Sequence, residues 1–473
     1  MRQQDDSTPL ARHAHSSSRN MYDNTIELLC LKTYVSGMRC NNPSYKSDSS
    51  SWMIRDSIRL SLDMERSDGY NDLEWAIGLN RLMLKIIGLW PPDNRDPHET
   101  LKSKIRLLCS IITLLFILAI PSFLSLLRVW GDIILVVDNL IYSLPVSIAI
   151  IKVFIIWYKQ EDLVSLIKMI AIDWMKPKMK EERDVMLKFA KISRIIAICG
   201  CLLPFIPMIV CFALIYFGLT LRHVTNLTDS GKPLMVQTYY LHNVSKSPQF
   251  ELTVVAQGVA LFITCVSYYA IDHFLGLLVL HIYGQMENLH TRLTHMERYI
   301  NFDSVLKYNV QDHNRLIRSI EIINDSFDLV LLVIIIYFGI IFCLLGFLIV
   351  NVLNDDGQMS LMQLGWYVAA TITILLHMGL YCAVGETLVT QCKKIHRATY
   401  DYTWYTLDPK ASRNLILIML RASKPLYITA GKTFPMTMAT FCNTEHKCLV
   451  SKLKKQKNEE STVPENHQLY PSP

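Results

Sequence analysis

The sequence predicts an all-α integral membrane protein. We expect a seven-helix bundle with a cytoplasmic N-terminus and an extracellular C-terminus, inverted relative to G-protein-coupled receptors. Three observations support this. Of the 473 residues, 51% are hydrophobic, and they gather in long uninterrupted runs. Lys and Arg concentrate in alternate loops. Two glycosylation sequons fall in a loop on the opposite side.

Six of the apolar runs are each long enough to cross a bilayer, which takes about 20 residues. They lie at about 105–127, 133–157, 195–219, 254–286, 327–350 and 361–389. A seventh run, 425–441, is shorter. At about 1.5 Å per residue it reaches about 25 Å, less than a hydrocarbon core of about 30 Å. The seven runs together make one membrane domain over 69–441.

Two polar segments flank this domain. Residues 1–68 carry 13 serines and mixed charges without an apolar core of signal-peptide length. We interpret them as disordered or as a gene-model artefact. Residues 442–473 are a polar tail that stands where the last helix would continue.

The orientation follows from the basic residues of the loops. The loops with many Lys and Arg are 69–104 with five, 158–194 with nine, 287–326 with five and 390–424 with seven. The intervening loops have few: one in 128–132, three in 220–253 and none in 351–360. The basic loops are therefore expected in the cytoplasm. The sequons at Asn226 and Asn243 then lie outside, where glycans are added.

Neither catalytic nor metal-binding motifs stand out. HExxH, GxSxG and P-loop patterns are absent, and the twelve cysteines include no CxxC pair. His281, His290 and His295 lie on different faces of a helix, which argues against a metal site. The net charge of +6 is modest. We expect no enzyme activity, no cofactor, no metal and no nucleic-acid partner.

Few polar side chains interrupt the apolar runs. Burying an unpaired charge in hydrocarbon is costly, so these residues should face the bundle interior, water or an interface. We interpret Lys152 and Glu386, near the expected cytoplasmic ends, as snorkelling to the membrane surface. Asp138 is open to two interpretations, a structural hydrogen bond or a ligand contact. The set is Asp138, Lys152, Asp272, His273, His377 and Glu386.

The expected outer halves of the second, third, fourth and sixth helices are rich in aromatic and sulfur side chains. If these faces converge, they form an apolar pocket that suits a small volatile or lipid-like molecule. An aromatic belt at the membrane interface is the alternative. The candidate ligand-binding residues are Ile134, Asp138, Ile141, Tyr142, Met208, Phe212, Tyr216, Phe262, Cys265, Tyr268, Trp366, Tyr367 and Ile374.

Two apolar stripes extend beyond the membrane. Hydrophobic residues recur every three or four positions at Met286, Leu289, Leu293, Met296 and Ile300 after the fourth run. The same spacing occurs at Leu316, Ile320, Ile323 and Phe327 before the fifth. We therefore expect both helices to continue as amphipathic helices, packed within one subunit or between subunits.

The C-terminal third resembles a known family. Residues 398–441 contain an aromatic pair, a proline, basic residues around an apolar helix and a TAGK run. The matching positions are Trp404, Tyr405, Pro409, Arg413, Arg421, Pro425, Thr429, Ala430, Gly431 and Lys432. This pattern resembles the most characteristic segment of insect odorant receptors, in a hymenopteran style. The resemblance extends over about 70–441.

This resemblance implies a function. Tuning receptors of the family are ligand-gated, non-selective cation channel subunits. They form a heterotetramer with a shared odorant receptor co-receptor in the plasma membrane of olfactory sensory neuron dendrites. The odorant, a small volatile or lipid-like molecule, sits among helices two, three, four and six. A gustatory receptor of the same superfamily, and a transporter or membrane enzyme, are the alternative functions.

The tail departs from the family pattern. The last helix of these receptors continues well beyond the position of Phe441, and here CNTEHKCLVSKLKK follows instead. An unspliced intron and a truly truncated, non-conducting receptor are the two interpretations. No gate residue of the family has a counterpart in this tail.

Overall fold

The computed structural model describes residues 49–91, 97–217, 226–227, 232–241, 244, 246–296, 302–354, 361–440 and 442. The described chain is almost entirely helical. Its elements are α2 (Ser49–Ile86), α3 (Pro97–Thr113), the π-helical turn η1 (Leu114–Ala119), α4 (Ile120–Arg128), α5 (Ile133–Tyr158), α6 (Gln160–Met175), α7 (Lys180–Tyr216), α8 (Gln249–Thr294), α9 (Phe302–Asn354), α10 (Leu361–Asp401), the 3₁₀ turn η3 (Trp404–Thr406), α11 (Pro409–Ala422), β1 (Thr429–Ala430) and β2 (Phe434–Pro435).

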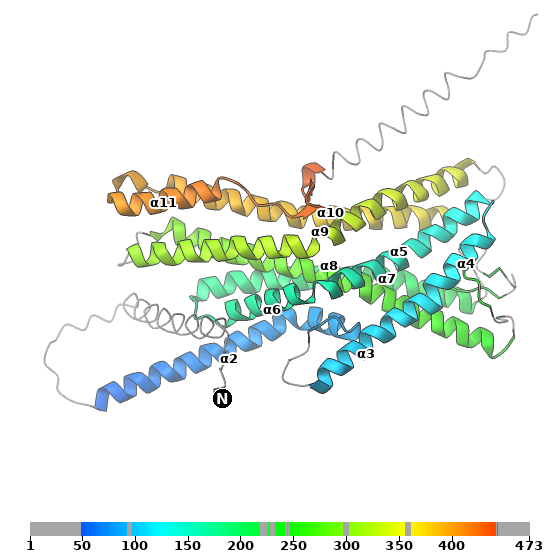
Figure 1. Ribbon diagram of the computed structural model, residues 1–473, viewed down its shortest axis with the longest axis horizontal. Helices are drawn as coiled ribbons and strands as arrows, with labels where there is room; N and C mark the ends of the chain where they lie inside the picture. The colour runs from blue at the N-terminus through cyan, green and yellow to red at the C-terminus, as the bar shows by residue number, and fades with distance from the viewer. Residues whose placement is uncertain are drawn as a thin grey trace, which may run out of the picture.

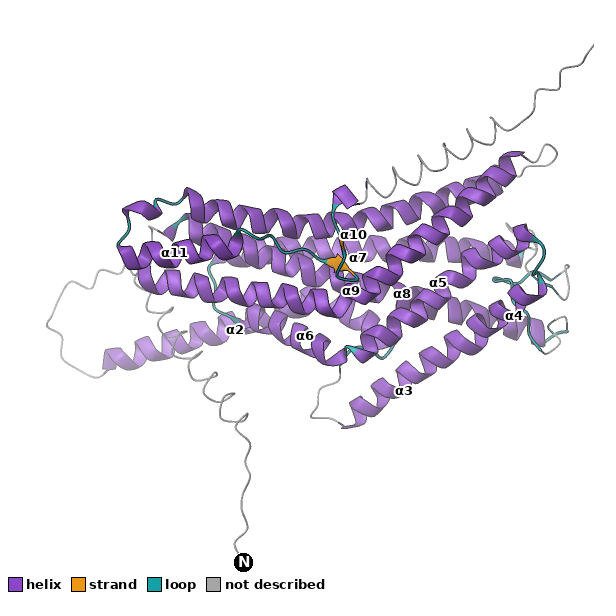
Figure 2. Cartoon of the chain, turned by 45° about the horizontal axis from the view of Figure 1, so that its top comes forward, coloured by secondary structure: helices purple, strands orange, loops and turns teal. Residues whose placement is uncertain are grey.

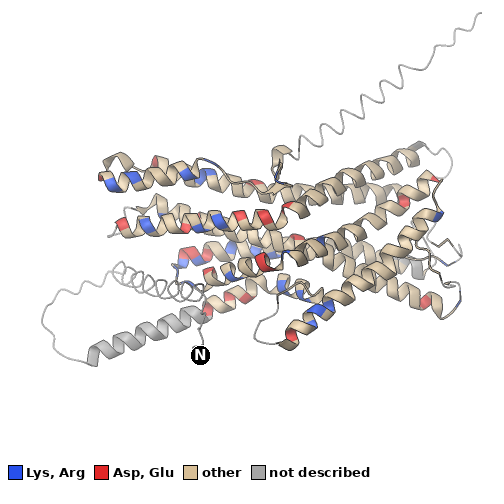
Figure 3. Ribbon diagram, viewed as in Figure 1, with Lys and Arg blue, Asp and Glu red and all other residues tan. Residues whose placement is uncertain are grey.

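The long helices run roughly side by side along one axis (Figures 1 and 2). We call the two ends of this bundle the α11 end and the α4 end, after the helices that lie there. Charged side chains gather in the half toward the α11 end, whereas the half toward the α4 end is nearly free of them (Figure 3). This distribution is expected of a bundle with one half in hydrocarbon and one half in water.

The six long apolar runs of the sequence are confirmed as helices long and apolar enough to cross a membrane. Their observed bounds are Pro97–Arg128, Ile133–Tyr158, Lys180–Val210, Gln249–Thr294, Phe302–Leu353 and Gln363–Thr406. Most of them extend past the predicted run at one end or at both, because polar turns continue the helices. The third begins earlier than predicted and ends earlier, at Val210.

Helix α8 forms the centre of the bundle. It packs against α2, α5, α6, α7, α9, α10 and η1. Ala260, Ala270, Leu278 and Leu289, which are spread along its length, are completely buried. A helix that is apolar on most of its sides has to be enclosed by others, and this explains the position of α8.

The amphipathic continuations of the fourth and fifth spans are confirmed. Met286, Leu289, Leu293 and Met296 are buried at the end of α8 and just after it. Leu316, Ile320, Ile323 and Phe327 are likewise buried on α9. Within the described chain, α8 and α9 pack on each other and on α10, so these stripes have partners in the same subunit. Ile300 lies outside the described residues.

The helix predicted over 425–441 is wrong for most of its length. Residues 429–435 form an antiparallel hairpin in which Thr429 pairs with Pro435 and Ala430 with Phe434. Gly431 and Lys432 have φ angles of 58° and 59°, a left-handed conformation that ends any helix. A helical turn starts only at residue 438. Counting the apolar residues in a stretch of sequence cannot detect this turn.

The polar segment predicted to be unstructured over 1–68 also needs a correction. Its last part, from Ser49, belongs to the long helix α2. Further along α2, the apolar positions Leu73, Ala76, Ile77 and Leu84 recur at helical spacing and are buried. Residues 1–48 lie outside the described residues.

The segment between α7 and α8 is tied down at the α4 end. The Gln257 side chain on α8 accepts hydrogen bonds from the backbone amides of Met235 (3.0 Å) and Val236 (3.3 Å). It also donates to the hydroxyls of Thr238 (2.8 Å) and Tyr240 (3.1 Å). One fully buried amide therefore holds this loop against the end of the bundle.

Candidate functional site

A cavity of about 270 Å³ lies between α7, α8 and α10. Its walls come from residues 193–203 of α7, 269–280 of α8 and 373–385 of α10. Leu331 of α9 and the hairpin residues Ile428 and Met436 complete it. Each segment lies near the middle of its helix. The cavity is partly open between α7 and α10, where the lining residues Leu203 and Leu376 are exposed. The C-terminal hairpin forms part of its wall.

Glycines make room for this cavity. Gly276 on α8 lines it, and a methyl group added there would meet no atom within 4 Å. The space beside Gly200 on α7 is instead filled by protein, because a methyl group there would lie 2.3 Å from Cε1 of His273. The first glycine therefore opens the cavity, and the second lets the His273 ring pack against α7.

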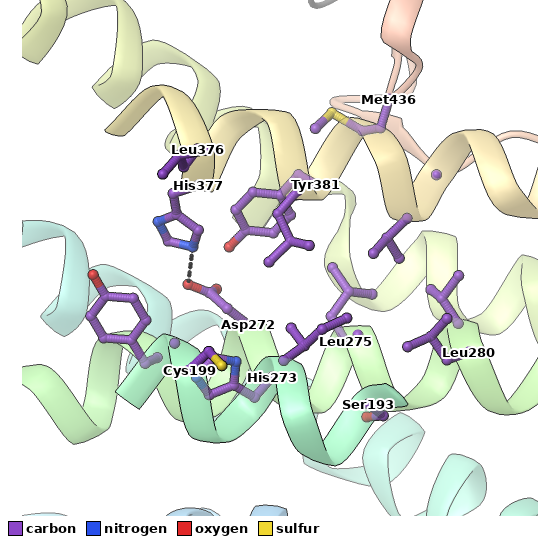
Figure 4. Close-up of a pocket in the computed structure, with 18 of the residues that line it drawn as sticks. Ser193, Cys199, Asp272, His273, Leu275, Leu280, Leu376, His377, Tyr381 and Met436 are labelled. Atoms are coloured by element: carbon purple, nitrogen blue, oxygen red, sulfur yellow. Dashed lines mark ion pairs between the residues drawn. The ribbon is translucent and has the colours of Figure 1, made fainter. Parts of the chain in front are cut away.

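A buried charge cluster borders the cavity. The Lys152 ammonium on α5 is fully buried and makes an ion pair with Asp272 on α8. It also donates a hydrogen bond of 2.7 Å to the carbonyl oxygen of Tyr268 and lies 3.9 Å from the centre of that ring. Nε2 of His377 on α10 lies 3.4 Å from the other Asp272 oxygen (Figure 4). One carboxylate thus connects three helices.

This cluster corrects the interpretation of Lys152 as a snorkelling side chain. Its ammonium points inward, where the Asp272 charge and the Tyr268 carbonyl compensate for the loss of water. Asp272 and His377 were recognised in the sequence as intramembrane polar groups. The contact of Asp272 with Lys152 could not be predicted, because it joins residues 120 positions apart.

Four aromatic rings form a column beside the carboxylate. Tyr269 stacks on His273, with ring centroids 5.9 Å apart, and on His377 at 5.4 Å. Tyr381 stacks on His377 in turn at 5.1 Å. All four rings line the cavity. The column therefore fixes the orientation of His377, since Tyr269 and Tyr381 stack on its ring.

The hairpin that closes the cavity is attached to α9. The amide of Thr429 donates a hydrogen bond of 2.7 Å to the Asn324 side chain, and the Gly431 amide donates one of 3.0 Å to the Asp328 carbonyl. Gly385 of α10 lies directly beneath, and a methyl group there would lie 2.1 Å from the carbonyl oxygen of Met436. The hairpin is therefore held by polar bonds on one side and by close packing on the other.

A second buried charge cluster lies toward the α11 end, in α6, α8 and α9. Asp173 contacts Nε2 of His281 at 3.1 Å and a guanidinium nitrogen of Arg315 at 2.5 Å. Burial alone would raise the pKa of Asp173. The hydrogen bond from His281 and the positive charges of Arg315 and Lys176 outweigh burial, so the pKa lies well below its usual range. This cluster lines no part of the cavity and acts as a structural connection.

Comparison with known proteins identifies the family. The family model described as 7tm Odorant receptor matches residues 132–446 of the chain. The chain belongs to the insect odorant receptor family. The resemblance found in the sequence is thus confirmed, and so is a multi-pass membrane protein.

The relatives of this odorant receptor are distant. It is 29% identical to Odorant receptor 10 of Aedes albopictus over 204 residues, which cover 41% of this chain and 52% of that receptor. It is 25% identical to Odorant receptor Or2 of Anopheles gambiae over 210 residues, 42% of this chain and 54% of that receptor. These matches span about half the length of each relative.

A solved structure shows the same fold. The insect olfactory receptor OR5 from Machilis hrabei superposes on this odorant receptor with a TM-score of 0.68, over 81% of this chain and 98% of that chain. The two sequences are 16% identical. The overall fold is therefore shared. At this identity the likeness shows the fold and no shared ligand.

The structure brings together several of the residues predicted to bind the odorant. The indole of Trp366 donates a hydrogen bond to the Tyr142 hydroxyl at 3.0 Å. Asp138, Tyr268 and Tyr367 are buried. Four more pack as partly buried side chains against the main core, or beside Tyr142 in a smaller apolar cluster: Ile134, Ile141, Ile374 and Met208.

Others in that predicted set lie apart. Phe212 and Phe262 are exposed, and Phe262 packs on Phe205 with ring centroids 5.4 Å apart. Cys265 is half-buried, and the Tyr216 side chain lies outside the described residues. None of the other twelve lines the cavity, whose lining comes from other positions of α7, α8 and α10. Odorant contact with the thirteen stays a prediction. The feature of the sequence that could have predicted this cavity was the group of intramembrane polar residues, since Asp272, His273 and His377 all line it.

The family motif residues have structural positions. Trp404 and Tyr405 begin η3 and pack edge to face with ring centroids 6.0 Å apart. Arg421 lies 3.4 Å from Glu321, and Lys432 lies 3.6 Å from Asp325, both on α9. Pro425, Thr429, Ala430 and Gly431 belong to the segment that leads into the hairpin or to the hairpin itself.

Both sequons lie in the segment between α7 and α8. Asn226 is 4% exposed, and its amide nitrogen, the atom that would carry a glycan, donates a hydrogen bond of 2.8 Å to the Lys232 carbonyl. A glycan would replace the other hydrogen of this nitrogen and would need space around a nearly buried side chain. Asn243 lies outside the described residues. Glycosylation at either position stays a prediction.

Proposed function

We propose that this chain is a tuning odorant receptor: an odorant-gated, non-selective cation channel subunit that assembles with the shared co-receptor in the plasma membrane of olfactory neurons. Membership of the family supports this function. The observation that carries it is the apolar cavity between α7, α8 and α10, because a receptor for volatile molecules needs such a space.

The cavity volume suggests the size of the ligand. An engineered protein cavity of about 150 Å³ takes up benzene, which has six carbon atoms. By the same ratio, a cavity of about 270 Å³ suits a molecule of about eleven non-hydrogen atoms. Small volatile compounds have this size. One solved form of the Machilis hrabei receptor OR5 is a complex with eugenol, a ligand in this range.

The cavity also offers a route from ligand to channel. Ile428 and Met436 form part of its wall and precede the end of the chain, where the family places the pore helix. A ligand that favours one position of these residues would shift the population between closed and open states. We place the α11 end in the cytoplasm, because the Lys- and Arg-rich loops gather there.

A cavity-filling variant tests this function. Gly276→Leu should fill the space without a clash, since nothing lies within 4 Å of an added methyl group. Gly339→Leu on α9 is the matched control, because it is equally unobstructed and lies outside the cavity. The chain is co-expressed with a co-receptor, and currents are recorded with a panel of volatile compounds.

We expect odorant-evoked cation currents from the unaltered chain, at least a tenfold loss of sensitivity in Gly276→Leu, and an unchanged response in Gly339→Leu. Surface labelling verifies that each variant reaches the membrane. Equal responses from the two leucine variants would place the ligand elsewhere. A receptor that reaches the surface with its co-receptor and gives no current with any compound would contradict the proposed function.

A further inference from the structure

We infer that the Asp272–His377 pair presents a hydrogen-bond acceptor to the cavity, and that the preferred ligand is a neutral alcohol or phenol of about eleven non-hydrogen atoms. This inference rests on the proposed function and narrows its ligand class. It depends on the charge state of the cluster, on the tautomer of His377 and on the other polar groups around the cavity.

The charge count favours a neutral His377. Lys152 and Asp272 carry opposite charges and compensate each other in their ion pair. Asp272 is the one carboxylate among the described residues that line the cavity. A protonated His377 would add a positive charge in an apolar interior without a second carboxylate to balance it, which is costly.

The tautomer follows from the position of the carboxylate. Nε2 of His377 faces Asp272 at 3.4 Å, and a carboxylate can only accept. No hydrogen bond joins the two atoms in the described chain, but a lone pair on Nε2 would face the negative carboxylate. The ring proton is therefore favoured on Nε2, which leaves the lone pair on Nδ1. Within the described part of the chain, no hydrogen bond engages Nδ1. His377 lines the cavity, and its side chain is 14% exposed, so the acceptor is within reach of a ligand.

The other polar groups discriminate less between ligands. Nε2 of His273 and the Tyr381 hydroxyl are enclosed by protein atoms. The Thr373 hydroxyl donates to the carbonyl of Ala369 at 2.9 Å. The hydroxyls of Tyr269 and Ser193 can both donate and accept, so they suit alcohols, ketones and esters alike. Nδ1 of His377, in contrast, requires a donor from the ligand.

The expected preference is moderate. A ligand hydroxyl that donates to Nδ1 gains one hydrogen bond, whereas a carbonyl oxygen placed there meets a lone pair. One hydrogen bond corresponds to about a threefold to tenfold change in affinity. Apolar contacts with residues such as Leu280 and Leu380 should supply the rest of the affinity, equally for all ligands of one size.

Three probes of the same number of non-hydrogen atoms test the inference: decanol, decanal and undecane. Their dissociation constants are measured by thermal-shift titration of the purified full-length chain in detergent micelles. Unaltered receptor is compared with His377→Phe, which keeps a stacking ring and removes both nitrogens. The ratio of the two affinities for each probe cancels its partition into detergent. Thr373→Val is the control, since it removes a hydroxyl that is already bonded to its own helix.

We expect His377→Phe to weaken decanol binding by about threefold to tenfold, with no change for decanal or undecane, and Thr373→Val to leave all three unchanged. Three results would overturn the inference. His377→Phe could weaken the binding of all three probes by the same factor, it could weaken decanal binding more than decanol binding, or no probe could bind at all. If His377→Phe does not fold, His377→Met replaces it. If that variant also fails to fold, the affinities of the unaltered chain for decanol and decanal are compared after correction for partition into detergent. Tighter binding of decanal than of decanol then overturns the inference.

This binding assay is independent of ion flux. A chain that prefers decanol and yields no current would contradict the proposed channel function while leaving the ligand class intact. A chain that conducts in response to odorants without any His377-dependent preference for alcohols would contradict the ligand class alone.

Discussion

The indole Nε1 of Trp366 donates a hydrogen bond of 3.0 Å to the hydroxyl oxygen of Tyr142 and ties α10 to α5. Both side chains are partly buried at the α4 side of the cavity-forming region. Each is large enough to fill the space between two helices while its polar atom is satisfied by the other. This bond is the firmest connection among the residues predicted from the sequence to surround the odorant.

Tyr142→Phe should lower the free energy of unfolding by about 1 kcal/mol, because the Trp366 indole loses its acceptor. Thermal unfolding in micelles measures the change. A double-mutant cycle with Trp366→Phe should give a coupling energy of about 1 kcal/mol. Tyr400→Phe is the matched control on an exposed ring and should have no effect. Additive effects of the two substitutions would show that the bond adds no stability.

The fold was largely predictable, because its determinants are local. The stripes at Leu289 and Leu293, and at Leu316 and Ile320, recur at helical spacing, and all four residues are buried. Counting apolar residues in a window located six spans for the same reason. The hairpin was missed because two residues, Gly431 and Lys432, adopt left-handed φ angles within an apolar stretch.

The site was less predictable, because it depends on contacts distant in the sequence. Asp272 and His377 were recognisable as intramembrane polar groups, but periodicity reveals a face and not a partner. The pairing of Lys152 with Asp272 required the packing of α5 on α8. The cavity also depends on Gly276, whose role is the absence of a side chain, and composition gives no indication of that.

Lys152→Met should be strongly destabilising. It leaves the Asp272 charge buried beside His377, without the Lys152 ammonium, at an expected cost of about 3–5 kcal/mol. Combining it with Asp272→Leu should recover most of this loss, because no buried charge remains. Lys191→Met, on the exposed side of α7, is the control. Chemical unfolding of all four proteins in micelles measures the differences. If Lys152→Met alone is as stable as the unaltered chain, the ion pair between Lys152 and Asp272 contributes little to stability.

The charge cluster at the α11 end should make stability depend on pH. The pKa of Asp173 is depressed because its hydrogen bond from His281 and the charges of Arg315 and Lys176 outweigh the opposing effect of burial. A depressed carboxyl pKa adds stability that is fully present above the unfolded pKa of about 3.9 and is lost as the pH falls further, through the folded pKa.

Asp173→Asn should therefore cost about 2–3 kcal/mol near neutral pH, and the difference from the unaltered chain should shrink below about pH 4. Unfolding curves of both proteins between neutral and acidic pH measure this difference. Effects of other carboxyl groups cancel in the subtraction. A gap that stays constant down to the acid limit would mean that Asp173 is not held ionised by its neighbours.

Gly385→Ala should disturb the attachment of the C-terminal hairpin. A methyl group at this position would lie 2.1 Å from the carbonyl oxygen of Met436, a backbone atom that cannot rotate away. Alanine favours a helix over glycine by about 1 kcal/mol, but displacing the hairpin should cost about 1–3 kcal/mol more than this gain. The receptor should unfold at a lower temperature and respond less strongly to all ligands.

Gly365→Ala is the matched control on the same helix, because no atom lies within 4 Å of an added methyl group there. It should be neutral or slightly stabilising, since only the helix propensity changes. Met436 and Ile428 contribute to the cavity wall, so a shifted hairpin also alters the space that a ligand fills. If Gly385→Ala is as stable and as responsive as Gly365→Ala, the close approach of α10 to the hairpin does not couple ligand binding to the C-terminal segment.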